Sequence, residues 1–179
     1  EYLLLGYILS GTKVHNQFLI LVAIIMVAGL TTKTMAQSSV STNATGEIVT
    51  AITLAKTSDL AFGKMAVPSG DAVVTVSYAG DRTALPLANV NLISSTYNAA
   101  GYHVTGSGSY TYGIQIASST IIHSGLNSMT VDNFISSIGT TGQLSSGAQD
   151  FTVGADLHLT SGQAVGQYLG TYNVTVAYN

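Results

Sequence analysis

The stretch FTVGADLHL, residues 151–159, decides the fold. Apolar side chains occupy every second position of it, and small, polar or charged residues fill the positions between. The apolar set is Phe151, Val153, Ala155, Leu157 and Leu159, and the intervening set is Thr152, Gly154, Asp156 and His158. A period of two places the two sets on opposite faces of a β-strand. We therefore predict a strand over residues 151–159 with one buried face and one polar face.

The same period recurs elsewhere along the chain. In residues 110–116 and 170–178 the predicted core faces consist of Tyr110, Tyr112, Ile114 and Ile116, and of Tyr172, Val174, Val176 and Tyr178. Further strands are predicted over residues 47–55, 60–62, 72–78, 90–93 and 101–105, whereas residues 118–147 are irregular and are predicted to form long loops. Short alternating strands separated by Gly, Ser, Asn and Asp are typical of an all-β, antiparallel, immunoglobulin-like β-sandwich of about 8–10 strands.

An unbroken apolar run, residues 18–30, precedes the strand-forming part of the chain. The run is shorter than the ~20 residues that cross a bilayer as a helix, so we expect no permanent membrane span. Its flanks, Lys13 before it and the small residue Ala36 after it, are typical of a cleavable signal peptide over residues 13–36. We interpret residues 1–12 as an upstream extension from a misplaced start, residues 37–46 as a flexible leader and residues 47–179 as the β-sandwich domain.

The charge of the predicted mature chain argues against a polyanionic partner. Beyond Ala36 there are three cations, Lys56, Lys64 and Arg82, and seven acidic residues, which leaves a net charge of −4. Binding to nucleic acid or to an anionic membrane requires clustered Lys and Arg, which the chain lacks. Because the chain has no cysteine, it has no disulfide framework, thiolate metal site or cysteine nucleophile.

Motifs that carry chemistry are absent from the sequence. Asp156 and His158 share one face of a predicted strand, as two metal ligands can, but no third ligand accompanies them, and we interpret them as a solvent-facing polar row. No nucleophile elbow, phosphate loop, calcium loop or marked carboxylate pair occurs. We predict no catalytic, metal-binding or cofactor-binding residues, and no cofactor.

Tyrosine is the enriched aromatic residue, and it raises the question of sugar binding. Tyr97 and Tyr102 are our candidates for a binding surface, because exposed aromatic rings that cluster stack on sugar rings. For Tyr110 and Tyr112 the continuation of their face into Ile114 favours a core position.

Several short motifs also appear in an order that resembles a known family. They are DLAFG at residues 59–63, VTV at 74–76, GDR at 80–82, HVTG at 103–106, FTVGA at 151–155 and GQYLGTYNVTVAY at 166–178. Together they resemble a bacterial secreted family known as domain of unknown function 4402, over residues 45–179, and more distantly spore coat protein U and fimbrial subunits. That resemblance implies an extracellular structural or adhesive role and supplies no catalytic residues.

Two functions follow as expectations. The first is a non-enzymatic, exported structural protein of the periplasm, outer surface or extracellular space, which forms a fimbria-like or matrix polymer with itself or with other surface proteins. The predicted assembly strand carries Tyr172, Val174, Val176 and Tyr178, and the leader, residues 37–46, is a second element that can pair across molecules. The alternative is a monomeric secreted module that recognises a glycan or a surface partner. A secreted enzyme is a third, weaker hypothesis.

Overall fold

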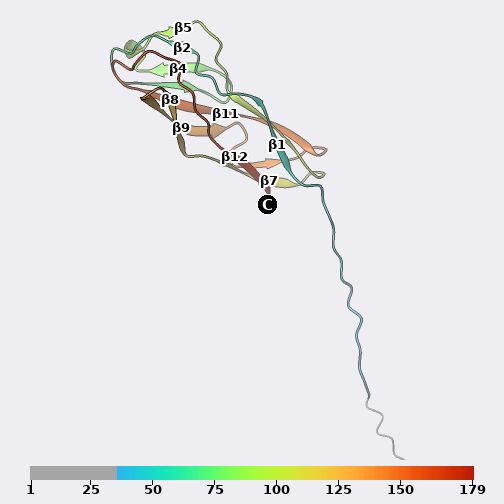
Figure 1. Cartoon of the computed structure of the whole chain (residues 1–179). Coiled ribbons are helices and arrows are strands. Elements are labelled where there is room, and N and C mark those ends of the chain that lie inside the picture. Colours follow the sequence, from blue (N-terminus) through green and yellow to red (C-terminus); the bar gives the residue numbers. More distant parts are fainter. Residues whose placement is uncertain (1–35) are drawn as a thin grey trace, which may run out of the picture. The chain divides into compact units, whose positions relative to one another are not determined.

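The structure, a computed structural model, describes residues 36–179. The predicted upstream extension and nearly all of the predicted signal peptide therefore lie outside the described residues. The chain divides into two units, Glu1–Gly46 and Glu47–Asn179. In the first unit, residues 36–46 form no helix or strand and are exposed. The second unit contains all of the regular structure described below (Figure 1).

The second unit is built almost entirely of antiparallel strands. They are β1 (Thr53–Ser58), β2 (Lys64–Met65), β3 (Ala72–Val76), β4 (Arg82–Leu85), β5 (Leu92–Ile93), β6 (Ala100–Thr105), β7 (Thr111–Ile116), β8 (Ser119–Ser124), β9 (Asn127–Ser136), β10 (Thr141–Gln143), β11 (Ala148–Leu159) and β12 (Val174–Tyr178), with one short 3-10 helix, Leu87–Asn89. No helix within residues 36–179 is long and apolar enough to cross a membrane.

The long strand β11 organises the largest sheet, which has seven strands. Its first half pairs with β6 and its second half with β3, while β9 pairs along its other edge. β1 extends the sheet beyond β6, β4 extends it beyond β3, and β8 extends it beyond β9. A second sheet has the order β10-β7-β12, and β2 and β5 form a third, small sheet. The predicted antiparallel β-sandwich is confirmed.

Two hydrophobic clusters fill the space between these layers. One lies between β6 and β11 of the large sheet and the β10-β7-β12 sheet, and its fully buried members include Tyr112, Val104 and Val153. The other lies under β2 and β5 and includes Val74 and Leu157. The alternation in residues 151–159 is confirmed, because Phe151, Val153, Ala155, Leu157 and Leu159 are all at most 4% exposed.

The prediction of long loops over residues 118–147 is wrong, because β8, β9 and β10 lie there. A bulge in β9 hides its periodicity. Asn133 has a φ of 50°, and the register with β11 shifts at this point. Buried positions before the bulge are odd-numbered, Met129 and Val131, whereas the buried position after it is Ser136. An extra residue in one strand reverses which face each later side chain occupies, so no single alternation runs through β9.

Strand ends also differ from the prediction. Residues 60–62 form no strand, only an isolated bridge between Ala61 and Asn98. β5 is limited to Leu92–Ile93, and β12 begins at Val174, so residues 90–91 and 170–173 of the predicted strands lie outside them. β1 begins at Thr53, so residues 47–52 of the predicted first strand are unpaired. Tyr110, predicted to belong to the core face of its strand, precedes β7 and is 44% exposed, and its ring lies 5.7 Å from that of Tyr178.

Candidate functional site

The outer edge of β12 is an unpaired strand edge. β12 pairs only with β7 among the strands of residues 36–179. Ala117 N–H donates to the Asn173 carbonyl, and Asn179 N–H donates to the Thr111 carbonyl. Hydrogen-bonded and non-hydrogen-bonded pairs alternate in an antiparallel ladder. The odd-numbered residues of β12 therefore bond β7, and the main-chain N–H and C=O groups of Val174, Val176 and Tyr178 point away from it.

The edges of β1, β4 and β8 carry features that discourage pairing with another strand. β1 carries Lys56 and a register shift between Lys56 and Ser58, and β4 is followed directly by Pro86. The edge of β8 is covered by the chain near Leu169, whose N–H and C=O groups both bond His123. Charge, bulges, proline and covering loops are the usual protections of a sheet edge. β12 has none of them in residues 172–178.

The even-numbered side chains of β12 point into the sandwich but are only half-buried. Val174, Val176 and Tyr178 pack on the cluster that contains Tyr112, and Tyr172, just before the strand, has its ring 4.4 Å from that of Phe134. β1 of the opposite sheet lies near β12 without pairing to it (Figure 1). No strand pairing joins the two sheets on the side between β1 and β12, and we call this the open side.

Side-chain hydrogen bonds link the two layers of the sandwich along this open side. At one end, the Tyr178 hydroxyl donates to the Thr50 carbonyl at 2.8 Å and accepts from Ser107 N–H at 2.7 Å. At the other end, the Tyr102 and Tyr172 hydroxyl oxygens share a hydrogen bond of 3.0 Å. These contacts hold the segment of residues 172–178 against β6 and against residues next to β1 and β6 through side chains, and none of them uses the main-chain edge of β12.

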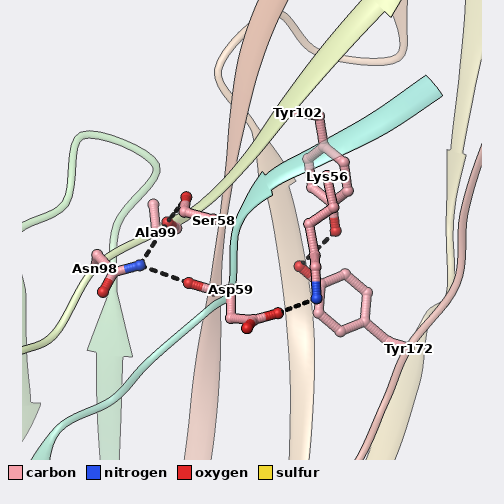
Figure 2. Close-up of polar contacts among 7 residues, drawn as sticks. All are labelled: Lys56, Ser58, Asp59, Asn98, Ala99, Tyr102 and Tyr172. Atoms are coloured by element: carbon pink, nitrogen blue, oxygen red, sulfur yellow. Dashed lines mark hydrogen bonds and ion pairs between the residues drawn. The ribbon is translucent and has the colours of Figure 1, made fainter.

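A charged pair lies beside the tyrosine pair (Figure 2). The Lys56 ammonium bonds the Asp59 carboxylate, and this bond raises the pKa of Lys56. Asn98 anchors the turn after β1, because its side-chain amide donates to the main-chain carbonyls of Asp59 and Ala99. Burial raises the pKa of Tyr102 and raises that of Tyr172 far above the ordinary range, where the hydrogen bond to Tyr102 adds to the effect. Both phenols therefore stay protonated and act as hydrogen-bonding caps on the core.

These raised pKa values predict a loss of stability in alkali. The folded protein keeps the Tyr172 proton where the unfolded chain loses it, so this stabilisation is complete below about pH 10 and declines as the pH rises further. Tyr172→Phe is expected to make the alkaline decline shallower, by up to about 1.4 kcal/mol per pH unit. Urea unfolding between about pH 8 and about pH 11 measures this slope. Tyr97→Phe, which removes a more exposed hydroxyl, is the control; equal slopes for the two variants would refute the prediction.

Tyr97 and Tyr102 do not form a common binding surface. Tyr102 is 8% exposed, and its ring stacks on Phe151 with the ring centroids 5.1 Å apart. The prediction that Tyr102 lies on an exposed binding surface is therefore wrong, because the face of β6 that carries it packs into the sandwich. Tyr97 is 40% exposed, and the Arg82 guanidinium carbon lies 4.4 Å from its ring centroid.

Arg82 has a structural role that sequence reasoning missed. Its guanidinium donates to the main-chain carbonyls of Phe62, Lys64 and Ile93, and so joins β4 to the small β2-β5 sheet. Charge-assisted hydrogen bonds of this kind are among the stronger ones. The signal in the sequence was its position after the Gly80-Asp81 turn, as one of only three cations beyond Ala36.

The histidines and acids of the polar face bond one another or neighbouring side chains. His158 Nε2 lies 2.8 Å from Asp132 Oδ1, and Asp156 accepts hydrogen bonds from Thr75 and Asn133. Asp156 and His158 therefore have different partners instead of converging on one point. Within residues 36–179 no three His, Cys, Asp or Glu side chains come together in a way that suits a metal ion.

A shallow hollow of about 260 Å³ lies on the outer face of β7 and β12. Gly113 and Ala177 form its floor by their small size, beside Gln115, Thr175 and Asn179. Its lining carries amides and a hydroxyl and no charged side chain.

Comparison with known proteins gives one result. No curated protein and no solved structure matches the chain. The family model for a domain of unknown function, DUF4402, matches residues 52–178, which span the strands from β1 to β12. The chain therefore belongs to the DUF4402 family.

Proposed function

We propose that this chain is an exported, non-enzymatic structural protein that assembles with itself into a fimbria-like or matrix polymer through strand edges. The observation that carries the proposal is the outer edge of β12, which is uncharged and pairs with no strand of residues 36–179 except β7 on its other side. An exposed edge of this kind offers hydrogen-bonding groups to a strand of another molecule. Residues 174–178, VTVAY, also combine high β-propensity with an absence of charge and proline, which favours pairing.

The proposal predicts polymers of the purified protein. The chain is expressed from all 179 residues and purified without denaturant, and mass spectrometry of the product is expected to give an N terminus at Gln37. Negative-stain electron microscopy and light scattering are expected to show filaments or a ladder of oligomers that grows with concentration. A single monomeric species at every concentration would contradict the proposal.

A second candidate is a monomeric module that recognises a glycan, and the hollow on the outer face of β7 and β12 favours it. Amide and hydroxyl groups around a small, uncharged depression suit the hydroxyl groups of a sugar. A glycan array probed with the purified protein tests this function. Binding that is lost on Ala177→Phe, which fills the hollow, would support it, and absence of binding to every glycan would count against it.

A further inference from the structure

We infer that the strand which completes the β12 edge comes from residues 40–48 of a second copy of this chain. The inference rests on the proposed function and names the partner segment. It is argued from three features of the described residues: the unused edge, the half-buried side chains beside that edge, and a segment with a strand-like pattern that forms no strand with residues 36–179.

The donor segment has the sequence pattern of a strand without being in one. Its apolar residues and its glycine lie at even positions, together with Thr42, and every odd position is polar. The even set is Val40, Thr42, Ala44, Gly46 and Ile48, and the odd set is Ser41, Asn43, Thr45 and Glu47. Ile52 and Leu54, which pack on the core, also lie at even positions, and Val49, Thr50 and Ala51 interrupt the alternation between Ile48 and Ile52. A period of two over residues 40–48, before β1 begins, indicates a segment that fits a sheet.

The apolar positions of this segment are exposed in the single molecule. Val40 is 90% exposed and Ile48 is 101% exposed. Residues 36–46 form no strand, and β1 does not begin until Thr53. Apolar side chains as exposed as Val40 and Ile48 are suited to burial against another molecule.

The acceptor edge has complementary properties. Its free N–H and C=O groups, at Val174, Val176 and Tyr178, are the partners that an added strand requires. An added strand continues the β10-β7-β12 sheet, so one face of it turns toward the open side, where half-buried apolar side chains lie. The even face of the donor provides Val40, Ala44 and Ile48 for that position. Its odd face, of Ser41, Asn43, Thr45 and Glu47, then joins the polar outer face that carries Thr175.

The donor and the acceptor are different surfaces of one chain, which determines the kind of assembly. A contact between unlike surfaces is heterologous and leaves one free donor and one free acceptor at each step. Such contacts propagate into open filaments or close into rings, whereas a contact between like surfaces stops at a dimer. Pairing of residues 40–48 with β12 of the next copy therefore predicts head-to-tail polymers.

Two variants separate the donor from the acceptor. Asn43→Pro with Ala44→Pro removes two main-chain donors from residues 40–48, where no strand of the single molecule is disturbed. Asn43→Ser with Ala44→Ser is its matched control. Val176→Pro removes an N–H that points to the free edge and leaves the bonds to β7 in place. Thr175→Pro is the contrast, because its N–H belongs to the β7 ladder, and it is expected to lower the melting temperature more.

The expected result is complementation, measured by light scattering on a sizing column. Each proline variant alone is expected to be monomeric, with polymer reduced to below about a tenth of the wild-type amount. An equal mixture of the two is expected to give a one-to-one dimer and nothing larger, because only one donor and one acceptor remain competent. The serine control is expected to polymerise like wild type.

A cysteine experiment gives a second readout that does not depend on the folding of Val176→Pro. Because the chain has no cysteine, an introduced pair reports directly on contact. Ser41→Cys, Asn43→Cys and Thr45→Cys are each mixed with Thr175→Cys under oxidation. At least one mixture is expected to form a disulfide-linked dimer, since opposed side chains in neighbouring strands are close enough for a disulfide. Thr83→Cys, on β4, is the control and is expected to form none.

The outcomes distinguish this inference from the proposed function. If the wild-type chain is monomeric, both fail. If the wild-type chain polymerises and the Asn43→Pro, Ala44→Pro variant polymerises equally well, the proposed function stands and the inference is overturned. An intramolecular disulfide in a monomer that carries both Ser41→Cys and Thr175→Cys would show that the segment covers its own edge, and would also overturn the inference.

Discussion

Gly154→Ala is expected to destabilise the fold by about 3 kcal/mol, although it adds a single methyl group to a polar face. The chain that leaves β3 crosses directly over Gly154. A Cβ placed there would lie 2.5 Å from the main-chain carbon of Ser77 and 2.5 Å from the main-chain nitrogen of Tyr78, and would overlap the Val76 carbonyl oxygen. All three neighbours are main-chain atoms, so no side-chain rotation relieves the clash. Either β11 or the end of β3 has to move.

Urea unfolding followed by circular dichroism measures this loss. Gly101→Ala on the neighbouring strand β6 is the matched control, because a Cβ there meets the hydroxyl groups of Thr57 and Ser58. Hydroxyl side chains can rotate away, so the expected loss is smaller, about 1 kcal/mol. Equal losses for the two variants would show that the crossing chain adapts to the methyl group and would refute this explanation.

Phe151→Ala is expected to cost about 3–5 kcal/mol, the usual range for deleting a buried aromatic ring. Phe151 is 3% exposed and lies in the half of β11 that pairs with β6. Its ring stacks on Tyr102 with an interplanar angle of 19°. The substitution therefore removes buried apolar area, leaves a cavity and releases Tyr102, whose hydroxyl group bonds Tyr172 at the open side. A small domain that is stable by about 5–15 kcal/mol loses much of its margin.

Phe151→Leu is the control for this prediction. It keeps most of the apolar volume and loses only the stacking and part of the ring, so the expected loss is about 1–2 kcal/mol. Chemical denaturation of both variants gives the two values, provided that the free energy of unfolding falls with denaturant concentration at the same slope in each. A loss below about 1 kcal/mol for Phe151→Ala would mean that the cluster around Tyr112 contributes little to the stability of the sandwich.

Alternation was informative wherever a strand is regular and covered on one face. The sequence alone predicted the strands around Val153, Ile114 and Val176, and each has its apolar set directed into the sandwich. It also predicted the antiparallel all-β class, because short strands joined by turns have few other stable arrangements. It failed where a local irregularity resets the pattern, as the bulge at Asn133 does in β9.

Only part of the candidate site could be predicted from the sequence. Residues 172–178 were predicted as an assembly strand on their pattern, but nothing in that pattern shows whether an edge is free. That property depends on which strands lie beside β12, and those neighbours are far away in the sequence, such as β7. In the same way, the sequence does not distinguish Tyr102 from Tyr97 as an exposed ring. Only the structure shows that Tyr102 is buried and Tyr97 is exposed.

Composition and period therefore determined the class of the protein, the direction of most strand side chains and the charge of its surface, because these depend on each residue and its near neighbours. Only the tertiary structure decided the unguarded edge of β12, the capping of the open side by Tyr172 and Tyr178, and the requirement for glycine at position 154. Each of these depends on main-chain groups from distant segments meeting at one place, and a single-residue or periodic signal carries no information about such a meeting.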